Sequence, residues 1–338
     1  MNKVEVITRY NLQDNPDIDI LDYTEENWLN ERRKGIGGSD VGAIMGTNEY
    51  RSPLQVYKDK VENETSNTDN MFTRKGKDLE ALIRENYVKP ELQKQGYDVL
   101  PGTVMFINKQ FPWIRANIDA MAIPDFGSTK DNIGIEIKWV SDWGSTKWDN
   151  EESMYGIPPS YYDQVQTYMA VLGLKLFIVC AMFDANWKCK FYKIHRDDER
   201  IEQIIAKTKT FYDYNMQMKI PPRYSSELDK EIIKKEISEA KEQEEPISLT
   251  LDDSLNEDIA RYKYLTQQAK SISDEANKVK DIIVNKYMEN RRPSNSVYKV
   301  SISSYESSRF DSTTFKAENP DLYAKYLKTT SGLRVTIK

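Results

Sequence analysis

Residues 134–139 read Gly-Ile-Glu-Ile-Lys-Trp, a short apolar stretch that carries a carboxylate and an amine at alternate positions. Such an apolar run is typical of a buried strand, and residues two apart on a strand point to the same face. Glu136 and Lys138 therefore share one face, while Ile135 and Ile137 point to the other. The stretch predicts a strand that presents one acid and one amine together.

A second acid lies seventeen positions upstream, at Asp119 in the apolar segment Trp113–Ala122. Buried charges are costly unless they are paired or bound to a metal. Two carboxylates on neighbouring strands offer the oxygen ligands that Mg²⁺ prefers. A metal held there activates water and stabilises charge on a phosphodiester, and a lysine adds a point cation. The pattern predicts metal-dependent phosphodiester cleavage, and the alternative is an ion pair of Glu136 with Lys138 on an exposed strand face.

The composition is that of an ordinary globular protein, with 338 residues of which 39% are hydrophobic and 30% charged. This length suits one large domain with an appendage, or two domains. No apolar run approaches the length of a membrane span, and the N-terminus lacks the apolar core of a signal peptide. Two cysteines make no disulfide framework, so we expect a reducing compartment and a cytoplasmic location.

The chain has a single histidine, His195, which excludes histidine-rich zinc sites and leaves little room for a catalytic triad. It follows an alternating strand, and we expect it at that strand's exposed end. The net charge of −6 is mild evidence against nucleic-acid binding. A narrow basic channel is nevertheless compatible with an acidic exterior, because the local field captures the ligand.

The hydrophobic patterns predict an α/β core, a mixed sheet flanked by helices, over residues 1–222. Strands are expected at Val4–Ile7, Tyr97–Met105, Trp113–Ala122, Ile133–Val140, Leu174–Phe183 and Lys188–His195. Helices are expected at Thr24–Lys34, at Asp40–Met45 with Ser39 as its N-cap, from Ser52-Pro53 to about Val61, and at Phe72–Val88, Pro159–Leu172 and Asp197–Lys219.

A charged, partly helical linker is predicted over 223–250, followed by a C-terminal helical and β extension over 251–338. Apolar residues recur there at three- and four-residue steps from a capping box at Ser254, which predicts one long amphipathic helix to about Asn290. The remainder predicts strands and one helix interrupted at Asn319-Pro320: Val297–Ser303, Arg334–Lys338 and Thr313–Leu327.

Five motifs follow one another in order: Gly35-Ile-Gly-Gly-Ser-Asp40, Arg74-Lys-Gly-Lys-Asp-Leu-Glu80, Asp119, Glu136-Ile-Lys138 and Tyr162-Asp-Gln-Val-Gln-Thr-Tyr168. Together they resemble the YqaJ-like viral recombinase family, the phage-lambda-exonuclease type of the PD-(D/E)XK, or restriction-endonuclease-like, superfamily. The resemblance covers roughly residues 24–220. The proline that the superfamily name places before the aspartate is Ile118 here.

The resemblance implies a role for each matching residue. Asp119 and Glu136 would bind the metal with the backbone carbonyl of Ile137, and Lys138 would be the catalytic lysine. Glu80 matches the helix glutamate that assists at the metal. Gln164, Gln166 and Tyr168 match the helix motif beside the active site. Ser39 and Arg33 match the residues that hold a DNA 5′-phosphate.

Helix geometry distinguishes among these matches. Gln164 and Tyr168 lie four apart and share a helix face, whereas Gln164 and Gln166 do not. Ser39 is first a helix cap, and the glycine-rich turn at a helix N-terminus adds free N–H groups that favour a phosphate. The loop containing Trp143 and Trp148 is compatible with base stacking, with core packing or with a lid.

The resemblance implies an Mg²⁺-dependent exonuclease, with Mn²⁺ as a substitute, that digests one strand of duplex DNA from the 5′ end and leaves a 3′ single strand. It further implies a homotrimer, a single-strand annealing protein as partner, and a phage or prophage gene expressed in a bacterial host. Two alternatives stay open. One is a structure-specific endonuclease on the same core, and the other is a nuclease whose C-terminal unit mainly docks a partner.

Overall fold

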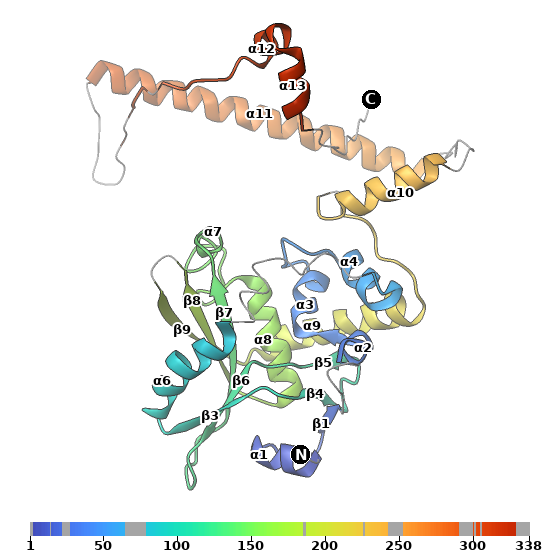
Figure 1. The fold of residues 1–338 in the computed structure, drawn as a ribbon, viewed down its shortest axis with the longest axis vertical. Helices are drawn as coiled ribbons and strands as arrows, with labels where there is room; N and C mark the ends of the chain where they lie inside the picture. The colour runs from blue at the N-terminus through green and yellow to red at the C-terminus, as the bar shows by residue number, and fades with distance from the viewer. Residues whose placement is uncertain are drawn as a thin grey trace. The chain divides into compact units, whose positions relative to one another are not determined.

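The computed structural model describes residues 3–13, 15–21, 28–64, 79–184, 187–225, 227–242, 253–290, 300, 302–304 and 306–328. The chain divides into two compact units, Met1–Ile233 and Lys234–Lys338, which are treated separately (Figure 1). The first unit extends past residue 222 because Asp229 is buried and accepts a hydrogen bond of 2.5 Å from the Ser52 hydroxyl. The predicted domain limits at 222 and 250 stay predictions.

The first unit contains a five-stranded mixed sheet in the order β3-β6-β7-β8-β9. Its strands are β3 (Tyr97–Pro101), β6 (Ala120–Pro124), β7 (Ile133–Val140), β8 (Leu176–Phe183) and β9 (Lys188–His195). β7 and β8 are parallel, and the other pairs are antiparallel. The predicted fold class, a mixed sheet flanked by helices, is confirmed.

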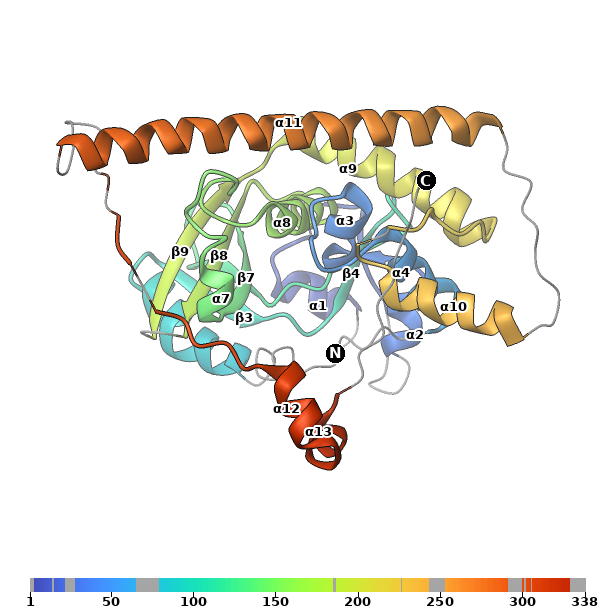
Figure 2. The ribbon, with the colours of Figure 1, turned by 90° about the horizontal axis from the view of Figure 1, so that it is seen from above.

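The helix α8 (Pro159–Leu172) makes the crossover that parallel strands require, here between β7 and β8. It begins with Pro159 in its first turn and ends at Gly173, whose φ of 67° is left-handed. It covers one face of the sheet, and α3 (Gly38–Met45) packs against α8 (Figures 1 and 2). The predicted bounds of β7, β9 and α8 are confirmed, and His195 is exposed at the end of β9 as expected.

The opposite face of the sheet is covered by a helical stretch that the structure describes from residue 79. It continues through the π-helical turn Arg84–Val88 into α6 (Lys89–Gln93), past the predicted end at Val88. Ile83, Val88 and Leu92 from this stretch pack against Ile135 and Ile137. The apolar side of β7 is thus buried, and Glu136 and Lys138 point toward α8.

Two of the predicted strands are each divided in two. Tyr97–Met105 separates at Gly102 into β3 and β4 (Met105–Asn108), because the chain leaves one sheet for another. A Cβ at Gly102 would lie 1.7 Å from the Ile118 carbonyl oxygen, so only glycine permits this approach. Trp113–Ala122 separates into β5 (Ile114–Arg115), which pairs with β2 (Ile36–Gly37), and β6. β4 pairs with β1 (Ile18–Leu21).

Two N-terminal predictions are wrong. Val4–Ile7 is part of the helix α1 (Lys3–Arg9), because Val6 and Tyr10, one helical turn apart, are both buried. Ser39 is not an N-cap, since α3 begins at Gly38 and Gly37 precedes it. In contrast, Ser52 caps α4 (Pro53–Tyr57) as predicted, by accepting a bond of 3.1 Å from the Gln55 N–H.

Most of the other helices are as expected or nearly so: α2 (Trp28–Arg33), the π-helical turn Lys58–Glu62, α9 (Asp198–Thr210) with the π-helical turn Phe211–Gln217, and α10 (Lys230–Glu242). The short helix α7 (Asp142–Ser145) was not predicted and lies in the segment expected to be a loop, where the Ser141 hydroxyl caps it. The helix predicted from Thr24 is described only from Trp28, and the one predicted from Phe72 only from residue 79.

The second unit contains the predicted long helix, α11 (Asp253–Asn290). Two short helices follow, α12 (Ser312–Glu318) and α13 (Pro320–Tyr326), separated at Asn319-Pro320 as predicted. Residues 300 and 302–304 are not in a strand, whereas 297–299 and the predicted strand 334–338 lie outside the described residues. No described helix combines the length and the apolar character needed to cross a bilayer.

Candidate active site

Asp119 and Glu136 occupy opposing positions where the ladder between β6 and β7 ends. The last register pair is Ala120 with Ile135, so continuing the antiparallel count places Asp119 opposite Glu136. Asp119 lies in the bend before β6 rather than within a strand, which corrects the prediction. Its Oδ2 accepts a hydrogen bond of 2.6 Å from the Ile137 N–H, so a side chain replaces the missing strand partner.

This contact also orients the Ile137 carbonyl. The N–H and C=O of one strand residue point to the same side of the strand. Because the N–H of Ile137 points to Asp119, its carbonyl oxygen lies on that side too. The structure thus gathers three groups at one place: two carboxylates and one backbone oxygen.

Glu136 is 2% exposed and uses its two carboxylate oxygens very differently. Its Oε1 accepts a hydrogen bond of 2.5 Å from Lys138 and one of 2.6 Å from the Gln164 side chain. Its Oε2 is buried and has no hydrogen-bond partner among the described residues. A buried carboxylate oxygen without a donor is costly, and a bound cation would offset that cost.

The two acids influence each other's protonation. Burial and then the nearby charge of Asp119 raise the pKa of Glu136 to about 8. Burial also raises the pKa of Asp119, although Lys138, the Ile137 N–H and Arg84 oppose that rise. The mutual effect places both carboxyls within electrostatic range, as a shared cation would require.

Lys138 is held by Glu136 and by an aromatic ring. Its Nζ lies 4.7 Å from the centre of the Tyr161 ring, in addition to the 2.5 Å contact with Glu136. Burial lowers the pKa of the Lys138 ammonium, but Glu136, Tyr161 and Asp119 together outweigh burial and hold that pKa above its ordinary value. Lys138 is therefore a fixed cation at neutral pH.

The donor set fits a hard divalent cation such as Mg²⁺. Asp119, Glu136 and the Ile137 carbonyl provide only oxygen, and Glu136 Oε2 has no donor among the described residues. Across the described residues, no three acidic, histidine or cysteine side chains group as metal ligands. Mg²⁺ sites commonly use one or two carboxylates and complete the shell with water and substrate phosphate, so two acids suffice.

The structure brings some of the predicted helix residues to this site and not others. Gln164 donates to Glu136 and, at 3.0 Å, to the Tyr168 hydroxyl, as their four-residue spacing predicted. Gln166 does not reach the site, because its amide bonds the His195 carbonyl and the Asp197 N–H at 2.8 and 2.9 Å. Glu80 pairs with Arg84 at 3.7 Å, and its charge raises the pKa of Glu136.

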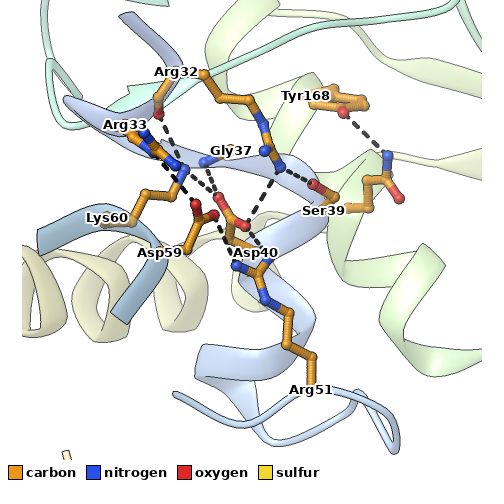
Figure 3. Close-up of polar contacts among 10 residues, drawn as sticks. Arg32, Arg33, Gly37, Ser39, Asp40, Arg51, Asp59, Lys60 and Tyr168 are labelled. Atoms are coloured by element: carbon orange, nitrogen blue, oxygen red, sulfur yellow. Dashed lines mark hydrogen bonds and ion pairs between the residues drawn. The ribbon is translucent and has the colours of Figure 1, made fainter. Parts of the chain in front are cut away.

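Ser39 lies in the first turn of α3, and its arginine neighbour is Arg32 rather than Arg33. Arg32 donates a hydrogen bond of 3.1 Å to the Ser39 hydroxyl, whereas Arg33 contacts Asp59 at 3.5 Å (Figure 3). A Cβ at Gly38 would lie 2.4 Å from the Tyr168 ring, so glycine lets this helix start approach α8. The resemblance assigned Ser39 and Arg33 to the 5′-phosphate, and of the two neighbouring arginines it is Arg32 that contacts Ser39.

Asp40, next to Ser39, is the centre of a buried ion network. Its carboxylate lies 2.5 Å from Arg51, 2.7 Å from Lys60 and 3.6 Å from Arg32, and it accepts a bond of 2.9 Å from the Gly37 N–H (Figure 3). Burial opposes ionisation, but the three cations hold the pKa of Asp40 well below its usual range.

The network carries more positive than negative charge. Four cations face two carboxylates, and together they are Arg32, Arg33, Arg51, Lys60, Asp40 and Asp59. An excess of cations beside a helix N-terminus favours a bound anion. The overall charge of −6 thus coexists with a locally basic site, as the sequence argument allowed.

Sequence reasoning missed Arg32, Asp40, Arg51 and Lys60. The seven-residue step from Arg32 to Ser39 was available in the sequence, but nothing local distinguished it from the six-residue step from Arg33. Lys60 carried no signal, since a lysine in a polar helix end is normally solvated, whereas here it is buried and donates to the Arg32 carbonyl at 3.0 Å.

Comparisons with known proteins agree with the predicted family. Residues 27–175 match the model of the YqaJ-like viral recombinase domain. The chain is 28% identical over 319 residues to the uncharacterized protein YqaJ of Bacillus subtilis (strain 168), covering 93% of this chain and 94% of that protein.

Two solved structures are also similar. One is the alkaline exonuclease LHK-Exo from Laribacter hongkongensis, with 19% identity, a TM-score of 0.45 and coverage of 64% of this chain and 99% of that one. The other is a phage related exonuclease from Haemophilus somnus 129PT, with 16% identity, a TM-score of 0.41 and coverage of 57% and 99%.

Proposed function

We propose that the protein, whose residues 27–175 match the model of the YqaJ-like viral recombinase domain, is a metal-dependent deoxyribonuclease that digests one strand of duplex DNA from its 5′ end. The observation that carries the proposal is the buried Glu136 Oε2 beside Asp119 and Lys138, for which none of the described residues provides a donor. The product would be a duplex with a 3′ single strand.

In this proposal Asp119, Glu136 and the Ile137 carbonyl hold Mg²⁺, for which Mn²⁺ would substitute. A bound divalent cation supplies a Lewis acid that activates water and neutralises charge on the phosphate. Gln164 donates a 2.6 Å bond to Glu136 Oε1 and thereby fixes the carboxylate with Oε2 on the side away from Gln164. Glu80 and Tyr168 act at longer range, through the charge and the packing around Glu136.

Lys138 acts as a cation and not as a general base. Its ammonium stays protonated because Glu136, Tyr161 and Asp119 together outweigh burial and raise its pKa above the ordinary value. A fixed ammonium stabilises the negative charge that develops on the phosphate oxygens during hydrolysis. The aromatic face of Tyr161 restricts where this ammonium lies.

Ser39, Arg32 and the N-terminus of α3 are proposed to bind the 5′-phosphate of the strand being cut. The Ser39 hydroxyl and the Arg32 guanidinium already contact each other at 3.1 Å, so a phosphate would bridge two groups that are in place. Asp40 pairs with the Arg32 guanidinium at 3.6 Å, and Lys60 donates a hydrogen bond to the Arg32 carbonyl at 3.0 Å. Arg33 and Gln166 have no part in this proposal, because their side chains are engaged elsewhere.

The second unit is proposed to mediate association, either with a single-strand annealing protein or between copies in a homotrimer. Exposed apolar residues repeat along α11 at heptad spacing: Leu265, Ile272 and Val279. Size measurement by light scattering, with and without residues 253–338, tests self-association. A monomer in both forms would contradict the trimer.

The decisive experiment uses linear duplex DNA with a 5′-phosphate on one strand only. We expect that strand to be degraded with Mg²⁺ and not with EDTA, and we expect Lys138→Ala to lose this activity. Equal activity of the variant would defeat the mechanism. Cleavage of covalently closed circular DNA as fast as linear DNA would favour an endonuclease instead.

A further inference from the structure

A pocket of about 200 Å³ lies next to Lys138, and none of the roles above uses it. Its walls come from the segment after α3, from the end of β7 with the turn that follows, and from the start of α8. Tyr161, whose ring contacts the Lys138 ammonium at 4.7 Å, is part of the wall. The pocket therefore adjoins the group proposed to stabilise the phosphate.

The lining is aromatic and well supported. Trp148 is buried and packs against Tyr161, Phe183 and Tyr192, with ring centres 5.3 to 5.8 Å apart. Tyr50 adds a further ring and is 74% exposed, whereas Trp139 lines the pocket at the end of β7 while its side chain packs on the opposite face of the sheet. Of the two tryptophans noted in this loop, Trp148 thus belongs to the pocket wall, and Trp143 is 93% exposed one residue from the wall.

Charge disfavours a phosphate inside this pocket. Lys147 is a wall residue, but it pairs with Glu49 from the opposite wall, and Glu152 adds a second carboxylate. Lys147 also lies 4.9 Å above the Tyr50 ring, so the pair crosses between two segments of the wall. A neutral planar ligand suits the pocket better than an anion does.

The size of the pocket suits one base. A cavity of about 150 Å³ is known to take a benzene ring, so about 200 Å³ accommodates a heteroaromatic ring system. Amides and hydroxyls of the wall, among them Asn48 and Ser141, offer donors and acceptors for the edge of such a ring. Bases stack on aromatic side chains with little regard to sequence.

The order of groups along α8 indicates which base this is. Gly38 faces Tyr168 and Gly42 faces Ser160, so α3 and α8 run in opposite directions. Ser39 thus lies beside the C-terminal end of α8, at Tyr168. Toward the N-terminal end of α8, Gln164 contacts Glu136, and Tyr161 contacts Lys138 and lines the pocket. From Tyr168 to Tyr161 the helix rises about 10 Å. The 5′-phosphate site and the pocket flank the carboxylates on opposite sides.

We infer that this pocket binds the base of the nucleotide on the 3′ side of the scissile phosphate, the nucleotide that becomes the new 5′ end. The inference rests on the proposed 5′-end nuclease function and extends it. Stacking of this base against Tyr50 and the buried tryptophan wall holds the strand in register while Lys138 meets the phosphate.

Binding without catalysis tests the pocket itself. In EDTA, tryptophan fluorescence follows titration with 5′-dAMP and with 2-deoxyribose 5-phosphate, which lacks the base. We expect the nucleotide to bind on the order of tenfold more tightly, as one stacking contact allows. Tyr50→Ala should remove this difference. Tyr214→Ala, another exposed tyrosine of the same unit, should retain it. Equal binding of both ligands, or an unchanged preference in Tyr50→Ala, overturns the inference.

Digestion tests the position of the base. A duplex with an abasic second nucleotide from the 5′ end should release its first nucleotide about tenfold more slowly than an intact duplex. An abasic first nucleotide should have little effect, and Tyr50→Ala should be insensitive to the abasic second position. Slowing by the first position alone overturns the inference. Absence of all digestion defeats the nuclease proposal, while the fluorescence titration still decides the pocket.

Discussion

Gln164 donates a hydrogen bond of 2.6 Å to Glu136 Oε1, the same oxygen that Lys138 contacts at 2.5 Å. Two donors therefore converge on one carboxylate oxygen, and the other oxygen is buried without a donor among the described residues. This asymmetry fixes the rotation of the carboxylate and leaves Oε2 as the oxygen that is proposed to bind the metal.

Removal of the Gln164 amide should weaken the site without removing a ligand. We expect Gln164→Leu to reduce digestion by about tenfold to a hundredfold, because Glu136 loses one of two bonds that orient it. Single-turnover digestion of 5′-phosphorylated duplex at several Mg²⁺ concentrations measures the effect. The control is Gln203→Leu, an amide on α9 that accepts a bond from Arg200. We expect saturating Mg²⁺ to restore the digestion rate of Gln164→Leu fully. A variant that digests DNA as fast as the wild type contradicts the role of Gln164 in orienting Glu136.

The stability of the metal-free protein should depend on the protonation of Glu136. Its pKa is raised to about 8 from an ordinary value of 4.5, so the folded protein binds the proton more tightly than the unfolded chain does. This contribution is complete below pH 4.5 and is lost as the pH rises toward 8. In EDTA, the melting temperature of the wild type minus that of Glu136→Gln should fall between about pH 5 and pH 8. A difference in melting temperature that does not change with pH contradicts this prediction.

Mg²⁺ should reverse that loss. A metal requires deprotonated carboxylates, so its affinity rises with pH through the pKa of Glu136. We expect Mg²⁺ to raise the melting temperature more at pH 8.5 than at pH 6.5. Asp119→Asn and Glu136→Gln should each remove the shift. A shift of equal size at both pH values would show that the metal binds elsewhere.

Arg32 and Arg33 should differ in their effect on end recognition. Arg32→Ala should reduce the preference for a 5′-phosphate over a 5′-hydroxyl by about ten- to a hundredfold, as expected for a charge-assisted hydrogen bond. Arg33→Ala serves as the matched control, since its guanidinium contacts Asp59. Competition between the two DNA ends in one reaction measures the preference. The opposite order of effects would restore Arg33 as the phosphate residue.

Asp40 should be required for stability. Asp40→Asn leaves the buried Lys60 without its carboxylate and Arg51 with Asp59 alone, and we expect a loss of about 3–5 kcal/mol in the free energy of unfolding. Asp131→Asn, which breaks only an exposed pair with Lys175, should cost less than about 1 kcal/mol. Urea unfolding measures both. Because the pKa of Asp40 is lowered, its contribution is present above pH 3.8 and is lost on acidification.

Local sequence was sufficient wherever one signal dominated. β7 was predicted to the residue because apolar side chains occupy alternate positions from Ile133 to Trp139, and α8 because Pro159 and Gly173 mark its ends. The shared face of Glu136 and Lys138 follows from the strand period alone. The family resemblance of residues 27–175 likewise rests on ordered local motifs.

Contacts between distant segments required the tertiary structure. The sequence could not show that Asp119 leaves its strand to bond Ile137, because that depends on where the β6–β7 ladder ends. Nor could it choose between Arg32 and Arg33, whose directions depend on where α2 and α3 lie.

The burial of Asp40 and Lys60 was equally invisible in the sequence, since a charge is buried only when the fold brings its partners around it. The sequence determined which chemistry the chain carries, because residue type and strand period are local properties. The tertiary structure decided which of those groups meet, because distances between segments arise only from packing.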